Sequence, residues 1–408
     1  MDVIDCGSLL PGTGEGPIGE GRILVADDGT VESVGTREGI DAPAGAAHHE
    51  FPEAFVIPGL IDAHVHLQGL RSMNPRDWVL EGDALGAARA TADLERLLAA
   101  GFTTVRDVGS TTGLGLRTAV EEGDIDGPRI FTSGQSISQT GGHGDAHFLP
   151  YEWAAETGLA LSTVADGPAE CRKAARKQIR EGVDLLKIMT TGGVLSERDS
   201  PHQSQFTAAE IRAMTEEAHR VDIPVASHAQ GTAGIERALE NGVDTIEHGF
   251  FMDQDVIDLF LDRDATFVPT LAIMHRLVEH GADFGVPEHA LRKAREARAA
   301  HFESTRLAAE EGVPIALGTD FVGADLVPHG ENALEAELLV EEIGLSEREA
   351  IAAGTSVAAR TLPDASVGTL EVGNDADFVV LDADPLDDIS ALRSVRATFK
   401  GGERVWRE

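Results

Sequence analysis

The sequence has few residues of the kinds that cross-link a chain or anchor it in a membrane. Its 408 residues include two cysteines, Cys6 and Cys171, and one tyrosine. Two cysteines exclude a disulfide framework and a CxxC metal site. Residues 1–5 lack the basic and apolar regions of a signal peptide, and no stretch approaches the ~20 apolar residues of a membrane span. We therefore predict a soluble, cytoplasmic protein.

Positive charge is also scarce. The chain has 33 lysines and arginines against 70 acidic residues, a formal net charge of -37. The lysines are Lys173, Lys177, Lys187, Lys293 and Lys400. High salt screens the self-repulsion of such a surface, so we predict a salt-adapted, halophilic source, the alternative being an acidic mesophilic enzyme. Nucleic acid and anionic membranes are excluded as partners on charge.

The two ends of the chain share a texture of short strands and turns. Residues 22–29 and 29–35 read as strands, and Asp27-Asp28-Gly29-Thr30 between them is typical of a hairpin. Residues 376–382 and 395–406 repeat this texture. The length fits one large barrel plus an accessory domain. We predict a β-sandwich domain from residues 1–57 and 362–408, and a barrel domain from residues 58–361.

Between the ends, β-branched runs alternate with helical stretches rich in Ala, Glu and Arg. The runs are 55–66, 103–107, 129–133, 184–189, 224–228, 245–248, 266–269 and 314–320. The helical stretches are 89–100, 168–181, 207–221, 232–241, 287–311 and 333–343. This alternation is typical of βα units, and eight runs predict an α/β fold with a (β/α)8 TIM barrel. A doubly wound sheet is the alternative, but it would not bring so many strand ends to one centre.

A pair of histidines closes the apolar run 56–67. His64 and His66 are two residues apart, so on a strand their side chains lie on one face, which Asp62 shares. Two neighbouring imidazoles can chelate zinc and similar metals. An isolated pair of this kind would more simply be two core histidines with satisfied hydrogen bonds.

Further metal-binding residue types end other runs. His228 ends 224–228, His248 ends 245–248, and Asp320 ends 314–320. In a barrel these ends surround the mouth of the active site. Together with His64 and His66, such residues on four strands are hard to explain by core packing, so we predict a metal centre.

Lys187 lies in an apolar run of a chain that otherwise avoids lysine. A buried ammonium is costly unless it is paired or neutral. CO2 would convert a desolvated lysine to a carbamate, whose two oxygens can bridge two metal ions. Pairing with Asp184, or a Schiff-base role, are the alternatives for Lys187 alone.

With these residues in place, the chain resembles the binuclear branch of the amidohydrolase superfamily. The motif is Asp62-x-His64-x-His66 with Lys187, His228, His248 and Asp320. The flanking segments that are also similar are 140–145, 187–196, 227–234, 318–320 and 368–382. They look most like the prolidase-type members, which cleave Xaa-Pro or related carboxy-terminal amide bonds. The resemblance implies a barrel flanked by a β-sandwich built from both chain ends.

The resemblance also implies two divalent metal ions, most simply Zn²⁺. The expected ligands are His64, His66 and Asp320 for the more buried ion, His228 and His248 for the other, and carbamylated Lys187 as the bridge. A hydroxide shared by the ions would attack the scissile carbonyl. Asp320 would take its proton and pass it to the leaving nitrogen; the alternative is that Asp320 is a plain ligand.

The expected substrate is a small peptide or an N-acyl amino acid. His143 lies in the glycine-rich segment 140–145 and is a candidate donor to a substrate carboxylate or carbonyl. Gln230 stands where similar prolidase-type proteins carry a tyrosine that helps to bind the terminal carboxylate. This departure leaves other N-acyl amino acids and cyclic amides open. His202 and His329 follow barrel strands and are candidates for the rim of the site.

Two other functions compete with the amide-bond peptidase. A cyclic amide hydrolase of the imidazolonepropionase or hydantoinase type would use the same scaffold, although the imidazolonepropionase type typically uses one metal and lacks the bridging lysine. A non-catalytic structural relative would tend to lose ligands, and the full set is present here. The arginine face of 287–311, formed by Arg292, Arg295 and Arg298, suggests either a homo-oligomer contact or a solvated surface.

Overall fold

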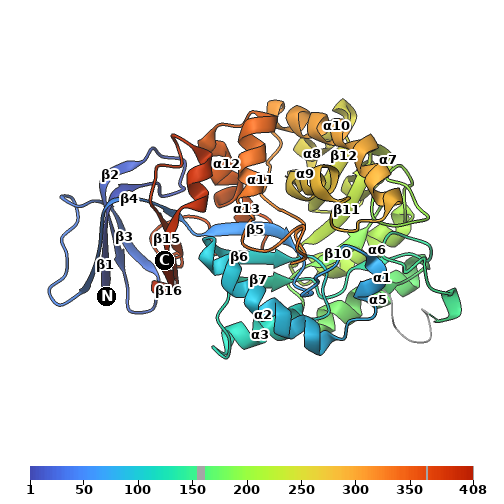
Figure 1. The fold of residues 1–408 in the computed structure, drawn as a ribbon, viewed down its shortest axis with the longest axis horizontal. Helices are drawn as coiled ribbons and strands as arrows, with labels where there is room; N and C mark the ends of the chain where they lie inside the picture. The colour runs from blue at the N-terminus through green and yellow to red at the C-terminus, as the bar shows by residue number, and fades with distance from the viewer. Residues whose placement is uncertain (154–160, 364–365, 408) are drawn as a thin grey trace.

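A computed structural model describes residues 1–153, 161–363 and 366–407. A mixed sheet lies at one side of the molecule, and the helices and parallel strands make up the rest (Figure 1). The mixed sheet has the order β16-β15-β14-β4-β1-β2-β3. Its strands are β1 (Asp2–Leu9), β2 (Ile18–Val25), β3 (Val31–Thr36), β4 (Ala47–Pro58), β14 (Phe378–Leu381), β15 (Val395–Lys400) and β16 (Glu403–Arg407).

This sheet joins the two ends of the chain. β14 pairs antiparallel with β4, with Val380 opposite Val56, while β1 pairs parallel with β4 on its other edge. β2 and β3 form the expected hairpin across residues 26–30. The buried face packs as one apolar cluster that includes Ile4, Val56 and Phe399. Strands from the two ends of the chain thus lie in one sheet.

The remaining strands are parallel and form two sheets. One has the order β5-β6-β7 and the other β13-β12-β11-β10-β8-β9. Their bounds are β5 (Leu60–Val65), β6 (Phe102–Asp107), β7 (Arg129–Thr132), β8 (Ile137–Ser138), β9 (Thr163–Val164), β10 (Leu186–Met189), β11 (Val225–Gly231), β12 (Thr245–Phe251) and β13 (Thr266–Val268). Segment 315–321 links them, because Ile315 bridges to Phe267 of β13 and Phe321 bridges to Val65 of β5.

Helices follow most of the parallel strands. They are α1 (Pro75–Trp78), α2 (Asp83–Ala99), α3 (Gly113–Glu121), α5 (Gly167–Glu181), α6 (Ala208–His219), α7 (Thr232–Glu240), α8 (Gln254–Arg263), α9 (Leu271–His280), α10 (Glu288–Glu310), α11 (Leu334–Leu338), α12 (Glu347–Ala353) and α13 (Ser356–Ala359). A π-helical turn, Leu339–Ile343, continues α11, and a 3-10 turn spans Ile389–Arg393. Within the part of the chain that is described, no helix combines the length and apolar character needed to cross a membrane.

Local sequence explains where these helices begin and end. Thr207 and Glu210 form a reciprocal capping box at the start of α6. Gly182 ends α5 in a left-handed conformation (φ 84°), which glycine adopts without strain. Every residue of β5 is buried, as expected for a parallel strand covered on both faces.

The structure departs from the sequence-based expectations in the short elements. The run 314–320 is not a continuous strand, because beyond the bridge at Ile315 the chain turns toward the metal-type residues and Asp320 has a left-handed backbone (φ 57°). The two-residue strands β8 and β9 were not predicted, since a pair of strand residues leaves no alternating pattern to detect.

Arg292 and Arg295 of α10 pair with Glu296 and Glu288 of the same helix, and Arg298 pairs with Glu279.

Candidate metal-dependent active site

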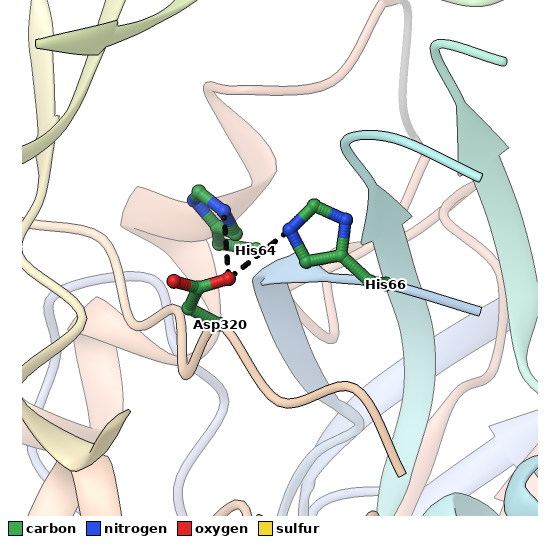
Figure 2. Close-up of side chains that lie close together, drawn as sticks. All are labelled: His64, His66 and Asp320. Atoms are coloured by element: carbon green, nitrogen blue, oxygen red, sulfur yellow. Dashed lines mark ion pairs between the residues drawn. The ribbon is translucent and has the colours of Figure 1, made fainter. Parts of the chain in front are cut away.

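Three predicted ligands converge at the end of β5 (Figure 2). One carboxylate oxygen of Asp320 lies 3.5 Å from Nε2 of His64 and 3.0 Å from Nε2 of His66. The ligand atoms of these three residues all lie within 4.8 Å of one another, as a shared cation requires. His64 and His66 come from the β5 end, and Asp320 comes from the segment that bridges to it.

The other two histidines continue this cluster. The ring of His248, on β12, is centred 5.0 Å from that of His64 and 4.6 Å from that of His228 on β11. Burial lowers the pKa of His228 and of His248 well below 6.5, with neighbouring charged groups as smaller influences. Both rings are therefore neutral, which is the form that binds a metal ion.

Lys187 lies on β10, next to β11, with 2% of its surface exposed. Burial lowers the pKa of its ammonium to about 8, although Glu247 and Asp320 oppose the shift. Among the described residues, no hydrogen-bond partner reaches its Nζ. Asp184 pairs instead with Arg117 at 2.6 Å, so the predicted alternative of a Lys187–Asp184 pair is not present.

These observations test whether the residues fit a binuclear metal centre. A buried amine without a partner is costly, and conversion to a carbamate would give it two oxygen ligands beside the histidine cluster. The donor set is imidazole and carboxylate, which suits zinc. The residues therefore fit the metal centre that the resemblance implies.

Asp320 supplies a negative charge beside His64 and His66. Burial alone would raise the pKa of its carboxyl, but His64 and His66 hold that pKa well below 3.8. Burial also opposes the charged form of His66, yet the hydrogen bond and charge of Asp320 leave the pKa of His66 raised. The carboxylate is thus ionised where a cation or a proton would be shared.

A buried network that the sequence did not reveal orients His64. Nδ1 of His64 lies 2.6 Å from Glu247, whose other oxygen accepts hydrogen bonds from Arg106 (2.8 Å) and Thr245 (2.6 Å). Arg106 also donates to the Ala63 carbonyl at 2.5 Å. With Nδ1 bonded to a carboxylate, Nε2 is left to face Asp320 and a metal.

A second supporting group lies behind His248. Nδ1 of His248 is 2.8 Å from the hydroxyl of Thr270, the residue before α9. Glu335 accepts hydrogen bonds from the first two backbone amides of that helix, Leu271 (2.9 Å) and Ala272 (2.6 Å). His248 and Thr270 have left-handed backbones (φ 76° and 58°), as Asp320 does, and such strain in non-glycine residues clusters at functional sites.

Asp62 has a structural role in the arrangement. Its carboxylate accepts hydrogen bonds from the backbone of His64 (3.0 Å) and of Thr319 (3.1 Å), and from the side chains of Thr319 and Asn332 (both 2.7 Å). It therefore ties the end of β5 to the residue that precedes Asp320.

A cavity of about 740 Å³ opens over the cluster. This volume is in the range of small-molecule sites. Its walls include all six predicted metal ligands together with apolar side chains. The apolar side chains include Leu70, Trp78, Phe148, Leu195, Phe250 and Ile273.

The predicted substrate residues fall into two groups. His143 and Gln230 line the cavity; the His143 ring stacks on His228 at 4.0 Å, and Oε1 of buried Gln230 has no partner among the described residues. His329 is buried behind the site, with Nε2 3.3 Å from the His66 carbonyl, and burial lowers its pKa to about 4. His202 is exposed and packs on Phe251 at 4.3 Å. In the described part of the chain, neither His202 nor His329 is among the cavity-lining residues.

Comparisons with known proteins agree with this geometry. A family model described as the amidohydrolase family matches residues 55–405. The chain is 31% identical to an ochratoxinase from Aspergillus niger over 99% of this chain and 86% of that protein. The crystal structure of that ochratoxinase has a TM-score of 0.90 and covers 99% of this chain and 95% of its own.

Two further relatives are similar over nearly the whole chain. A prolidase solved with N-methylphosphonate-L-proline is 33% identical, with a TM-score of 0.91 and full coverage of both chains. An imidazolonepropionase from Rhodococcus jostii is 27% identical over 97% of this chain and 92% of its own. The chain belongs to the amidohydrolase family and is a hydrolase of amide C–N bonds.

Proposed function

We propose that the chain hydrolyses dipeptides, Xaa-Pro or similar, or N-acyl amino acids with the help of two divalent metal ions. The observation that carries this proposal is the buried Lys187 ammonium without a partner among the described residues, in the same cavity as the four predicted histidine ligands and Asp320. The similar prolidase with its proline-containing phosphonate supports the substrate class.

The proposal includes the finer architecture. The parallel strands β5 to β13 and segment 315–321 would close into a (β/α)8 barrel, and the seven-stranded sheet would belong to a β-sandwich domain. The proposed domain boundaries are 1–57 plus 362–408 and 58–361. Because active sites of such barrels lie at the carboxyl ends of the strands, this architecture accounts for the positions of His64, His228 and His248.

We assign the metal ligands as follows. His64, His66 and Asp320 would hold one ion, most simply Zn²⁺, and His228 with His248 the other. Lys187, as its carbamate, would bridge the two. When bound, the metal ions would supply an activated water at neutral pH and polarise the scissile carbonyl.

The protein's own residues would then position the substrate and move its protons. Asp320 accepts the proton of the attacking water and delivers it to the leaving nitrogen, since an amine leaves only when it is protonated. His143 and Gln230 lie on the cavity wall, where they can bind polar groups of the substrate. The apolar side chains of the cavity would pack against the substrate's side chains and exclude water.

Hydrolysis of a cyclic amide is the second candidate. The imidazolonepropionase relative and the replacement of the expected tyrosine by Gln230 favour it. Lys187, buried and without a hydrogen-bond partner among the described residues, argues against the one-metal imidazolonepropionase type of this candidate.

A substrate panel tests the choice between these functions. Zinc-loaded protein in high salt would be offered Xaa-Pro dipeptides, dipeptides without proline, N-acyl amino acids and cyclic amides, with release of the amine as the readout. Cleavage of the linear amides supports the proposal. Cleavage of cyclic amides alone would replace it with the second candidate.

A further inference from the structure

Lys293 of helix α10 binds the backbone of segment 193–199, part of which lines the cavity. The Lys293 ammonium donates to the carbonyls of Gly193 (2.9 Å), Ser196 (2.7 Å) and Asp199 (2.7 Å). An ammonium donates three hydrogen bonds and accepts none, so these three carbonyls satisfy all of its protons. One turn earlier, His289 of α10 lies with Nε2 3.2 Å from the Leu195 carbonyl. Lysine is rare in this chain, yet the Lys293 side chain is only 10% exposed.

Segment 193–199 forms part of the cavity wall and holds His143. Val194, Leu195, Ser196 and Glu197 all line the cavity. The hydroxyl of Ser196 lies 2.9 Å from Nδ1 of His143 and donates to the carboxylate of Asp199. Asp199 is itself fixed by the Gly193 amide (3.2 Å) and by the Lys293 contact at 3.7 Å.

The backbone of His143 is held by the same group of residues. Its amide donates to Oε1 of Gln205 at 3.0 Å, and Nε2 of Gln205 donates to Asp199 at 3.3 Å. A closed ring of hydrogen bonds therefore runs from His143 through Ser196, Asp199 and Gln205 back to His143. Gly193 completes the fit, because a Cβ there would meet Cε1 of the imidazole at 2.2 Å.

The direction of these bonds fixes the ring of His143. An ionised carboxylate has no proton to give, so Ser196 must donate to Asp199 and accept from Nδ1–H of His143. In the neutral imidazole the lone pair is then on Nε2. That nitrogen is left to accept an N–H or O–H of a cavity ligand, so in this tautomer His143 is an acceptor and not the donor to a carboxylate or carbonyl that the sequence predicted.

We propose that Lys293 is a positioning residue: it clamps segment 193–199 so that Ser196 and Asp199 hold His143 with Nε2 ready to accept a hydrogen bond from the substrate. The link to substrate rests on the proposed function, whereas the clamp itself does not. Among the described residues, Lys293 neither lines the cavity nor contacts a predicted metal ligand, so it acts through the loop.

Tryptic cleavage tests the clamp without any activity assay. Arg198 is exposed within the clamped segment, so trypsin can report how often that segment opens. Lys293→Met should speed cleavage after Arg198, located by mass spectrometry, by about tenfold or more. Lys177→Met is the matched control, since the Lys177 side chain is 60% exposed and forms a long ion pair, 3.8 Å, with Glu181. Equal cleavage of the Lys293→Met variant, the control and the wild type would overturn the clamp.

Kinetics test the positioning role. Lys293→Met should raise KM by about tenfold with little change in kcat, because the loss is in substrate binding. In a His143→Ala background the same substitution should have almost no further effect on KM. An additive effect in that double-mutant cycle would overturn the link to His143, as would an unchanged KM beside faster cleavage.

A second variant, Ser196→Ala, tests the proposal even if Lys293→Met fails to fold. Ser196→Ala removes only the hydroxyl relay and leaves the Lys293 contacts, which are to backbone carbonyls. It should keep the wild-type tryptic rate while raising KM as His143→Ala does; a wild-type KM would overturn the proposal. Wild-type protein that cleaves none of the amides would refute the proposed function, while the tryptic rates would still decide the clamp.

Discussion

Nδ1 of His64 and a carboxylate oxygen of Glu247 lie 2.6 Å apart, in side chains that are 1% and 0% exposed. Glu247 is in turn paired with Arg106, which is also fully buried, at 2.8 Å. The pKa of the Glu247 carboxyl is held far below its ordinary range: burial opposes the ionised form, but Arg106, Lys187 and His64 outweigh it. A buried ion pair thus supports a metal-type histidine and fixes which of its nitrogens faces the centre.

Glu247→Gln should therefore weaken metal binding and stability together. Loss of such a supporting carboxylate typically costs about 10–100-fold in metal affinity, and the unpaired Arg106 should cost about 3–5 kcal/mol of stability. Zinc titration against a competing chelator and urea unfolding measure the two effects. Glu303→Gln, at a position 78% exposed, is the matched control. A folded Glu247→Gln variant with wild-type zinc affinity would contradict this role.

Asp320→Asn should remove the proton transfer and preserve the fold. Asparagine tolerates the left-handed backbone found at Asp320 (φ 57°), and it cannot accept and release a proton. We expect turnover at saturating zinc to fall by about 10²–10⁴-fold, with the circular dichroism spectrum unchanged. Wild-type turnover in the zinc-loaded variant would leave Asp320 as a ligand at most.

Glu335 should make stability depend on pH. Burial raises its pKa to about 8 from an ordinary 4.5, even though the Leu271 and Ala272 amides oppose the shift. Between those two pH values the folded state holds a proton that the unfolded chain has released, so stability falls as pH rises and levels off above about 8. The contribution is at most about 1.4 kcal/mol per pH unit.

Glu335→Gln should remove this slope. The measurement is urea unfolding of metal-free protein at several pH values between 4.5 and 8, taken as the difference between variant and wild type. Glu341→Gln, at an exposed position, is the control and should leave the slope unchanged. Parallel pH profiles for Glu335→Gln and the wild type would mean that Glu335 is already ionised in the folded state.

Salt should stabilise the protein. A net charge of -37 repels itself, and screening shortens from about 10 Å at 0.1 M salt to about 3 Å at 1 M. The unfolding temperature should rise steadily with KCl, and glycerol at the same water activity should not reproduce the whole rise. Equal stability in dilute buffer and in molar KCl would argue against salt adaptation.

Much of the site was predictable because its residues lie at the ends of apolar runs. His64 and His66 share a face by their spacing alone. His228 and His248 lie in β11 and β12 as expected, but each strand continues for three residues past the histidine that was predicted to end it. The apolar setting of Lys187 predicted its burial, which the structure has at 2% exposure. Strand periodicity and the cost of burying charge are both readable from a sequence.

The supporting groups were not predictable in the same way. Glu247 meets His64 across 183 positions of sequence, and Glu335 reaches α9 across 64, so no local pattern connects them. The one available signal was a glutamate inside the apolar run 245–248, since a buried carboxylate needs a partner. His329 also follows the last predicted run, 314–320, but its Nε2 lies 3.3 Å from the His66 carbonyl, which its position in sequence could not reveal.

Metal content of the wild type and of Lys187→Ala, purified in high salt with zinc and bicarbonate, tests the binuclear centre most directly. We expect about two metal ions per chain in the wild type and a loss of both metal and amide hydrolysis in Lys187→Ala. We also expect that zinc with bicarbonate partly restores metal-stripped wild type. Full metal content in Lys187→Ala, or one ion per wild-type chain, would contradict the binuclear centre.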